Sequence, residues 1–146
     1  MVCLGNICRS PLAEGILKSK LPENSFIVDS AGTANYHMGS SPDVRSISIA
    51  KKNGLNISNL KGRQFTVSDF DTFDLIYTMD ASNFQNVIKL ARNADDIAKV
   101  NYILNEVYPN QNYDVPDPYY GGNEGFENIY TMLDEACNKI AEKLIK

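Results

Sequence analysis

The sequence predicts an α/β protein in which helices cover both faces of a parallel sheet. Short apolar, strand-like runs alternate along the chain with amphipathic helical patterns, and such alternation is typical of parallel sheets. The 146 residues contain no repeat, low-complexity tract or linker, and their number fits one compact domain. We therefore expect a single domain over residues 1–146.

Three apolar runs are the candidate strands, at residues 26–28, 75–77 and 100–104. A further strand is expected at the N-terminus, ahead of Cys3, where a central strand of such a sheet belongs. Only two residues precede Cys3, whereas strands usually have about 5–6 residues. We therefore expect that native residues of the first strand are missing from the chain.

Four helices are predicted from periodicity and from start and stop signals. A hydroxyl residue followed by proline, as at residues 10–11 and 41–42, is typical of a helix start. Apolar residues recur at helical spacing after both pairs, and an Asn-Gly pair at residues 53–54 favours a stop. A third helix is expected after Asp80 or Ser82. The fourth and strongest pattern keeps one face apolar through Phe126, Ile129, Tyr130, Leu133, Ala136, Cys137, Ile140 and Leu144.

Composition excludes several classes of partner. The chain has 14 Lys and Arg against 18 Asp and Glu, a net charge of −4, so nucleic acid and anionic membranes are not expected as main partners. No apolar run approaches the roughly 20 residues that span a bilayer. Three cysteines in an acidic chain without a leader pattern are not a secreted disulfide framework. We expect a cytoplasmic protein without membrane insertion.

An anion site is predicted in the loop between the first strand and the first helix. Backbone N–H groups there can surround an anion, and the helix dipole adds about half a positive charge. Gly5 and Asn6 are residue types that tolerate the positive φ of a tight anion nest. Arg9 offers a planar fork for two phosphate oxygens. The loop consists of Cys3, Leu4, Gly5, Asn6, Ile7, Cys8, Arg9 and Ser10.

The same loop predicts a nucleophile. A helix N-terminus and a neighbouring arginine both favour the thiolate of Cys3, and Ser10 could donate a hydrogen bond to its sulfur. A phosphate site and an activated thiol coincide, which indicates phosphoryl transfer through a phosphocysteine. Cys8 is either a packing residue or a redox partner of Cys3. Cys137 lies on the apolar stripe of the last helix and is expected to pack.

Asp117 is the candidate general acid, which a phenolate leaving group requires. Two prolines stiffen the loop around it and two tyrosines follow it, a combination suited to an aromatic phosphate ester. The alternative is a tyrosine-bearing turn that only packs on the core. His37 is the single histidine and carries no second signal.

Together, these residues resemble the low-molecular-weight protein tyrosine phosphatase family over essentially the whole chain. The resemblance implies a four-stranded parallel sheet in the order 2-1-3-4, with no metal and no cofactor. Where many members have a histidine before an Ala-Arg-Gln segment, this chain has Leu60. The motifs are residues 3–11, Asp29-Ser30-Ala31-Gly32-Thr33, Pro42-Asp43, Met79-Asp80 with Asn83, and Asp117-Pro118-Tyr119-Tyr120-Gly121.

The resemblance also implies roles for individual residues. Cys3 would attack phosphorus while Arg9 and the loop amides hold the equatorial oxygens. Asp117 would protonate the leaving oxygen and then deprotonate the attacking water. Asn6, Ser10 and Ser30 would form a hydrogen-bonding network that supports the loop. The aromatic walls of the substrate cleft would be Tyr36, Tyr119 and Tyr120.

The expected function is hydrolysis of phosphotyrosine in a protein substrate, and weak self-association is left open. Protein-arginine phosphatases of the same family resemble this loop but carry Thr where this chain has Ile7. Related arsenate reductases relay a disulfide through two further cysteines, and none occurs between Cys8 and Cys137. Sugar-transport phosphocarriers hold a phosphocysteine in a similar loop but need no acid such as Asp117. A module that only binds phosphate is a second non-enzyme alternative.

Overall fold

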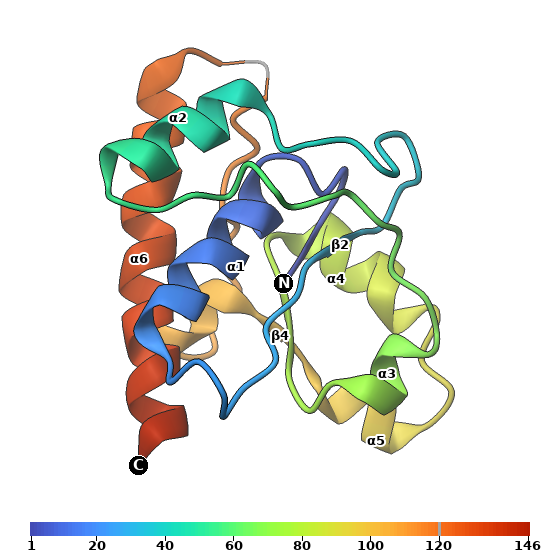
Figure 1. The fold of residues 1–146 in the computed structure, drawn as a ribbon. Coiled ribbons are helices and arrows are strands. Elements are labelled where there is room, and N and C mark those ends of the chain that lie inside the picture. Colours follow the sequence, from blue (N-terminus) through green and yellow to red (C-terminus); the bar gives the residue numbers. More distant parts are fainter. Residues whose placement is uncertain (120) are drawn as a thin grey trace.

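The computed structural model describes residues 1–119 and 121–146. They form three layers, a sheet in the middle with helices on both of its faces (Figure 1). All strands pair in parallel, and their order is β2-β1-β3-β4. The predicted fold class and strand order are confirmed. The strands are β1 (Val2–Cys3), β2 (Ala31–Gly32), β3 (Ile76–Thr78) and β4 (Val100–Tyr102).

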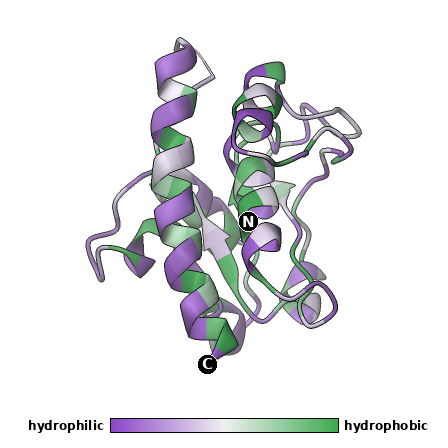
Figure 2. Cartoon of the chain, turned by 60° about the vertical axis from the view of Figure 1, so that its left-hand side comes forward, coloured by the Kyte–Doolittle hydropathy of each residue, from purple (hydrophilic) through white to green (hydrophobic). Residues whose placement is uncertain are grey.

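Helices α1 (Arg9–Lys20), α2 (Val44–Lys52) and α6 (Asn123–Ile145) form the layer on one face (Figure 1). Figure 2 shows hydrophilic and hydrophobic residues alternating along α6, as expected of a helix with one buried face. The predicted C-terminal helix is therefore confirmed. The core of this layer includes the fully buried side chains of Leu12, Ile16, Phe126, Leu133 and Ile140.

Helices α3 (Asp69–Thr72), α4 (Ala81–Ile88) and α5 (Ala94–Ala98) lie on the other side of the sheet (Figure 1). Successive strand residues point to opposite faces, so Val2 joins this second core while Cys3 joins the first. Phe65, Phe70, Ile76, Val87 and Val100 complete the second core.

Two predicted helix starts are shifted. Helix α1 begins at Arg9, before the Ser10-Pro11 pair, and its N-cap residue Cys8 makes no side-chain capping bond. Helix α2 is capped by Asp43, whose carboxylate accepts the Arg45 amide, and not by Ser41. The hydroxyl of Ser10 is thereby left for other contacts, described below.

The strand predicted at residues 26–28 is wrong, because β2 lies three residues later at Ala31–Gly32. Val2 pairs with Ala31 and Cys3 with Gly32, so the same register places partners of residues 26–28 ahead of Met1. The segment therefore has no ladder partner in this chain, and Ile27 is exposed. The strand predicted at 100–104 is shorter, since a 3-10 helix, η1 (Ile103–Glu106), takes over its end.

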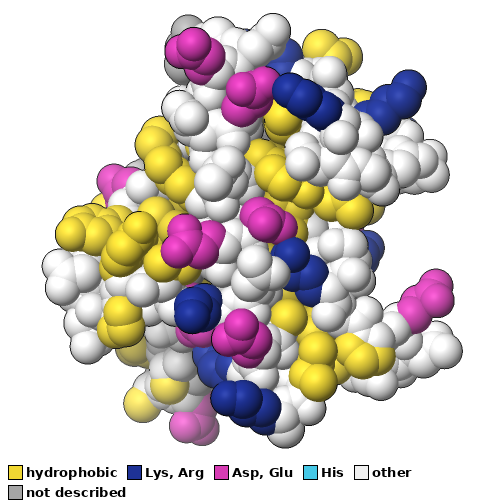
Figure 3. Space-filling view, turned by 90° about the vertical axis from the view of Figure 1, so that its left-hand side faces the viewer, with side chains coloured by type: hydrophobic (Ala, Val, Ile, Leu, Met, Phe, Trp, Pro, Cys, Tyr) yellow, Lys and Arg dark blue, Asp and Glu magenta, His cyan; other side chains and the backbone are white. Residues whose placement is uncertain are grey.

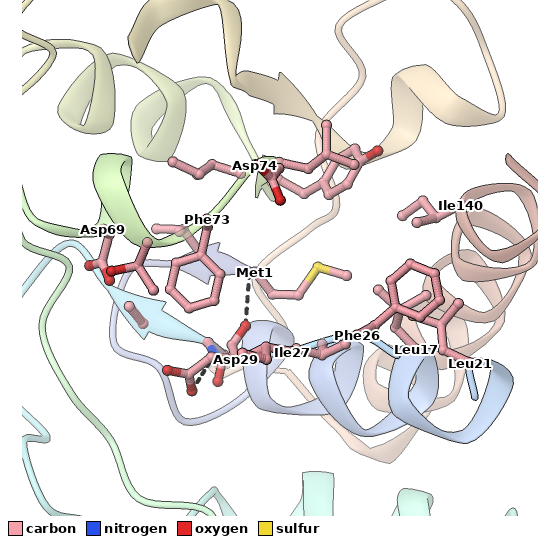
Figure 4. A pocket seen from close by; sticks show the side chains of 18 of the residues that line it. Met1, Leu17, Leu21, Phe26, Ile27, Asp29, Asp69, Phe73, Asp74 and Ile140 are labelled. Carbon is pink, nitrogen blue, oxygen red and sulfur yellow. Dashed lines mark hydrogen bonds between the residues drawn. The ribbon is translucent and has the colours of Figure 1, made fainter. Parts of the chain in front are cut away.

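A cavity of about 360 Å³ lies beside the first strand. Figure 4 shows Met1, Phe26 and Phe73 directed into it. The Met1 ammonium donates to the Asp29 carbonyl at 3.1 Å, and burial lowers the pKa of this amine. That further residues of the first strand precede Met1 stays a prediction.

The surface carries both charge signs. Figure 3 shows Lys and Arg side chains interspersed with Asp and Glu over the face that it presents, without a large patch of one sign. None of the helices within the described residues combines the length and the apolar character needed to cross a bilayer.

Candidate active site

The predicted phosphate loop follows β1 directly and runs into α1. Its position is at the carboxyl end of a central strand, where open parallel sheets bind their ligands. Cys3 ends the strand, is 3% exposed and lines a pocket together with residues of the loop. The thiol therefore lies where backbone amides and a helix N-terminus converge.

Two polar groups contact the Cys3 sulfur. Ser10 Oγ lies 3.0 Å from Cys3 Sγ in a hydrogen bond, and the Asn6 amide donates to Sγ at 3.3 Å. Ser10 Oγ in turn accepts from Asn6 Nδ2 at 2.8 Å, so its own proton can point to sulfur. This arrangement stabilises negative charge on sulfur, because both contacts can be donated to it.

Asn6 is the junction of the supporting network. Its φ of +55° is the left-handed conformation that Asn tolerates, and its side chain bonds to groups on three segments. Nδ2 donates to Ser10 and to Ser30 Oγ at 2.9 Å, while Oδ1 accepts the Arg63 amide at 3.1 Å. Ser30 Oγ then donates to buried Glu14 Oε1 at 2.6 Å. The Arg63 amide thus braces Asn6 in a chain that has Leu60 at the usual histidine position.

Gly5 and Asn6 both tolerate positive φ, but in the loop only Asn6 adopts it. The need for glycine is steric. A Cβ on Gly5 would lie 3.0 Å from Cδ2 of His37, tighter than most real contacts. His37 therefore packs against the loop, although its sequence context carried no signal.

Arg9 is the buried cation of the site, with 2% of its side chain exposed. Its Nη1 donates to Asp80 Oδ2 at 2.7 Å and to the Val115 carbonyl at 2.8 Å. Its Nη2 lies 3.6 Å from Asp117 Oδ2. Asp80 also caps α4 by accepting the Asn83 amide. The carboxylate that holds the Arg9 guanidinium is therefore fixed between the end of β3 and the start of α4. Nη1 of the guanidinium is thus bonded to protein groups, whereas Nη2 faces the carboxylate of Asp117.

Asp117 lies at the edge of the site with 38% of its side chain exposed. Its Oδ1 accepts the Tyr119 amide at 3.0 Å, which turns Oδ2 toward Arg9. Two bonds anchor the preceding residues at the end of β3. The Val115 amide donates to the Met79 carbonyl, and Asp114 accepts the Ala81 amide. The loop thus brings an acid from far along the sequence over the Cys3 loop.

One pocket of about 270 Å³ joins these groups. Tyr36, which is exposed, and Tyr119 line it, and the predicted third wall, Tyr120, lies outside the described residues. Asn6, Ser10 and Ser30 do not line this pocket; their side chains are buried and are joined by hydrogen bonds from Asn6. The lining residues are Cys3, Leu4, Gly5, Ile7, Cys8, Arg9, Tyr36, His37, Asp117 and Tyr119.

The other two cysteines differ from Cys3 in their surroundings. All three are unpaired and buried. Burial raises the pKa of Cys8 and of Cys137 to about 12, so both stay protonated at neutral pH. Cys137 Sγ lies 3.8 Å from the Ala13 carbonyl in the core, in agreement with a packing residue.

Sequence reasoning missed several residues of this site. The Asp80 carboxylate, the Val115 carbonyl and the Arg63 amide come from segments far apart in sequence, and so does Glu14. Asp80 and Asn83 belong to a motif of the sequence, but nothing there tells that the carboxylate bonds Arg9. Their place in the site could not be predicted from sequence, because each of these groups bonds to a residue on another segment.

Fold and site together define the class of α/β proteins that hold an anion over a cysteine at the end of a parallel strand. The anion would be bound by backbone amides, a helix N-terminus and one arginine, with an acid opposite. Within residues 1–119 and 121–146, no group of three or more His, Cys, Asp and Glu side chains is arranged to hold a metal ion.

Comparison with known proteins identifies the family. The model of the low molecular weight phosphotyrosine protein phosphatases matches residues 1–146. A low molecular weight phosphotyrosine protein phosphatase of Gallus gallus is 36% identical, over 97% of this chain and 92% of its own length. This chain belongs to the low molecular weight phosphotyrosine protein phosphatase family, whose members are hydrolases, and the predicted resemblance is confirmed.

Two solved structures bear on what the pocket accepts. Wzb of Vibrio vulnificus, in complex with benzylphosphonate, has a TM-score of 0.87 and 32% identity, covering 97% of this chain and 94% of that one. A Drosophila arginine phosphatase has a TM-score of 0.90 and 30% identity, covering 99% and 96%. Similar folds therefore occur in a protein that was solved with benzylphosphonate and in one named as an arginine phosphatase.

Proposed function

We propose that this chain hydrolyses phosphotyrosine in proteins, and small aryl phosphates, through a cysteinyl-phosphate intermediate. The observation that carries the proposal is one pocket lined by both Cys3 and Asp117, with Arg9 Nη2 3.6 Å from Asp117 Oδ2. A nucleophile, a cation and an acid that share a pocket are the parts that phosphoryl transfer to a thiol requires. Family membership supports the substrate class.

In the first step, the Cys3 thiolate attacks phosphorus and the bond from phosphorus to the tyrosyl oxygen breaks. Asp117 in its acid form donates its proton to that oxygen, so neutral tyrosine leaves. Arg9 and the loop amides bind the three equatorial oxygens as charge redistributes. The hydrogen bond from Ser10 stabilises the thiolate before attack.

In the second step, water attacks phosphorus and the bond between phosphorus and sulfur breaks. The Asp117 carboxylate accepts a proton from this water, which restores the acid and yields inorganic phosphate. The leaving group is the Cys3 thiolate, and the contacts from Ser10 and from the Asn6 amide favour its departure. No metal or organic cofactor enters either step of this proposal.

The choice of tyrosine over arginine rests on Ile7, whose side chain lines the pocket. An apolar side chain contacts a phenyl ring favourably, whereas a small polar residue leaves room for a guanidinium. The likeness to an arginine phosphatase makes phosphoarginine the second candidate substrate. We expect the wild type to cleave phosphotyrosine faster, and Ile7→Thr to shift the preference toward phosphoarginine. Faster cleavage of phosphoarginine by the wild type would refute the substrate assignment.

Turnover of p-nitrophenyl phosphate tests the chemistry. We expect multiple turnovers in wild type and none in Cys3→Ser. Asp117→Asn should strongly reduce turnover of phenyl phosphate, whose basic leaving oxygen needs a proton, because general acids contribute roughly 10²–10⁴-fold. Activity is expected to survive chelation by EDTA. A stable phosphoprotein without turnover in the wild type would instead identify a phosphocarrier. Binding of phosphate without any covalent step would identify a phosphate-binding module.

The proposal also covers the partner, the domain and the cellular location of the enzyme. Its partner is a phosphotyrosine-bearing protein, and the domain spans residues 1–146. A cytoplasmic location is proposed because Cys3, Cys8 and Cys137 are free thiols, which a reducing compartment preserves. Fractionation that finds the protein outside the cytoplasm would contradict that part.

A further inference from the structure

Arg45, in the first turn of α2, ties this helix to the phosphate loop through Asp43. The Asp43 amide donates to the carbonyl of Ile7 at 2.8 Å, so the capping residue of α2 is fixed to the loop. Arg45 Nε and Nη2 each donate to the Asp43 carboxylate at 3.0 Å. The guanidinium is therefore held at a fixed place relative to the loop that binds phosphate.

The same guanidinium reaches the loop that carries the acid. Arg45 Nη2 donates to the Tyr119 carbonyl at 2.9 Å, and Nη1 donates to the Gly121 carbonyl at 3.0 Å. Its Cζ also lies over two aromatic rings, 5.6 Å from the centre of Tyr119 and 4.6 Å from that of Phe126. Four donated bonds and two ring contacts fix one side chain between two segments that are more than 70 residues apart in sequence.

Tyr119 connects Arg45 to the acid itself. Its carbonyl accepts from Arg45, while its amide donates to Asp117 Oδ1 at 3.0 Å. That second bond leaves Oδ2 as the oxygen that faces Arg9, at 3.6 Å. The carbonyl and the amide of Tyr119 lie in successive peptide planes that are joined at its Cα, so a shift of the carbonyl can be passed on to the amide and to the Asp117 carboxylate. A displacement of about 1 Å can cost about a hundredfold in rate.

The charge of Arg45 is compensated by Asp43. Hydrogen bonds from Arg45, above all from its side chain, lower the pKa of Asp43, so the pair stays ionised at neutral pH. The cation thus has its own counter-ion 3.0 Å away. Its role at the acid loop is then carried by hydrogen bonds to carbonyls and by ring stacking, for which a planar arginine is suited and a lysine is not.

We propose that Arg45 is a positioning residue for proton transfer, holding the backbone of Tyr119 so that Asp117 Oδ2 faces the leaving oxygen. The inference rests on the proposed role of Asp117 as general acid. It assigns to α2 a part in the reaction beyond packing: the helix sets the distance between the loop that binds phosphate and the loop that delivers the proton.

The test compares two substrates that need the acid to different extents. Phenyl phosphate has a basic leaving oxygen that must be protonated, whereas p-nitrophenyl phosphate has an acidic one that needs little help. The measured quantity is kcat/KM for phenyl phosphate divided by kcat/KM for p-nitrophenyl phosphate, on one preparation. This ratio does not depend on the amount of folded enzyme, so partial misfolding of a variant does not affect it.

Arg45→Gln is expected to lower this ratio roughly tenfold, part of the about 10²–10⁴-fold that a general acid supplies. Arg45→Lys is expected to lower it as well, because lysine cannot bridge two carbonyls and Asp43 at once. Arg92→Gln is the matched control. Arg92 also bonds two carboxylates, Asp71 and Asp96, but its contacts lie outside the pocket, so its loss should leave the ratio unchanged.

Asp117→Asn separates this inference from the proposed function. If Asp117→Asn leaves the ratio unchanged, Asp117 is not the acid and the proposed mechanism fails. If Asp117→Asn lowers the ratio while both Arg45 variants keep the wild-type value, Arg45 does not position the acid. In the double variant Asp117→Asn with Arg45→Gln, the ratio should equal that of Asp117→Asn alone. A further fall in the double variant would also overturn the inference.

Discussion

Replacing Asn6 tests the network behind Cys3 in a way that separates hydrogen bonding from backbone conformation. Asn6→Gly removes the side chain but keeps access to a φ of +55°, whereas Asn6→Ala removes the side chain and also resists this φ. The lost side chain makes three hydrogen bonds, to Ser10, Ser30 and Arg63. At about 1 kcal/mol each, Asn6→Gly should lower the free energy of unfolding by about 3 kcal/mol.

Asn6→Ala should be less stable than Asn6→Gly by about a further 1 kcal/mol, because a left-handed conformation disfavours residues with a Cβ. Urea unfolding measures both differences: with a slope of about 2 kcal/mol per M, they correspond to shifts of roughly 1.5 M and a further 0.5 M. Both variants should also lose kcat/KM, since Ser10 loses the donor that directs its proton to Cys3.

Asn110 is the matched control for the conformational part. It has a φ of +64° and is exposed, outside the network. The difference between Ala and Gly at Asn110 should therefore be similar in size, about 1 kcal/mol, while kcat/KM stays at the wild-type value. An Asn6→Ala variant at least as stable as Asn6→Gly would refute the conformational argument. An Asn6→Gly variant as stable as wild type would refute the energetic value of the network.

Three further predictions follow from burial and packing. Burial raises the pKa of Cys8 to about 12 from 9.0, so its contribution to stability is fully present below pH 9 and is lost as pH rises through 12. Urea unfolding above pH 9 should therefore show a smaller alkaline loss in Cys8→Ala than in wild type, and equal losses would contradict this. Gly62→Ala should lower Tm, at a cost of about 1–3 kcal/mol, because a Cβ there would lie 2.3 Å from the His37 carbonyl oxygen. Gly122→Ala, with nothing within 4 Å of its Cβ, is the control, and equal Tm values for both variants would count against the packing argument. An extension of alternating valine and threonine before Met1 should raise Tm by pairing with residues 26–28, whereas a Gly-Ser extension of equal length should not. Equal effects of the two extensions would show that the unpaired edge does not accept a strand.

The sequence was sufficient where a signal is local. The long apolar stripe of α6 needs only spacing along one helix, and the loop from Cys3 to Ser10 combines a nucleophile, a cation and a helix start within eight residues. Both were predicted for that reason. The strand order agreed with the prediction because it follows from the family resemblance, whose motifs extend over the chain.

The failures share a physical cause, which is dependence on a partner elsewhere in the chain. Residues 26–28 have strand propensity, but a strand exists only where a neighbour can pair with it, and β1 begins at Val2. Gly5 is a residue type of tight loops, but the sequence does not tell that a Cβ there would meet the ring of His37. Arg45 has no local pattern that tells which carbonyls it will bond. The propensity to form a strand can be read from one segment. Strand pairing and hydrogen bonding between side chain and backbone depend on a second segment as well.

The carboxylate of Glu14 determines which groups donate and which accept in the chain of hydrogen bonds that ends at Cys3. Glu14, 3% exposed and paired with Lys18, offers only acceptor oxygens as a carboxylate, so Ser30 must donate to it. Ser30 Oγ is then an acceptor for Asn6 Nδ2, which has donors only and gives its second proton to Ser10. Because Ser10 accepts there, its own proton is free for an acceptor, and the Cys3 sulfur at 3.0 Å is nearer than the Ala31 carbonyl at 3.5 Å. An acceptor at one end of this chain of bonds thus favours a donor at the other, where the thiolate needs one.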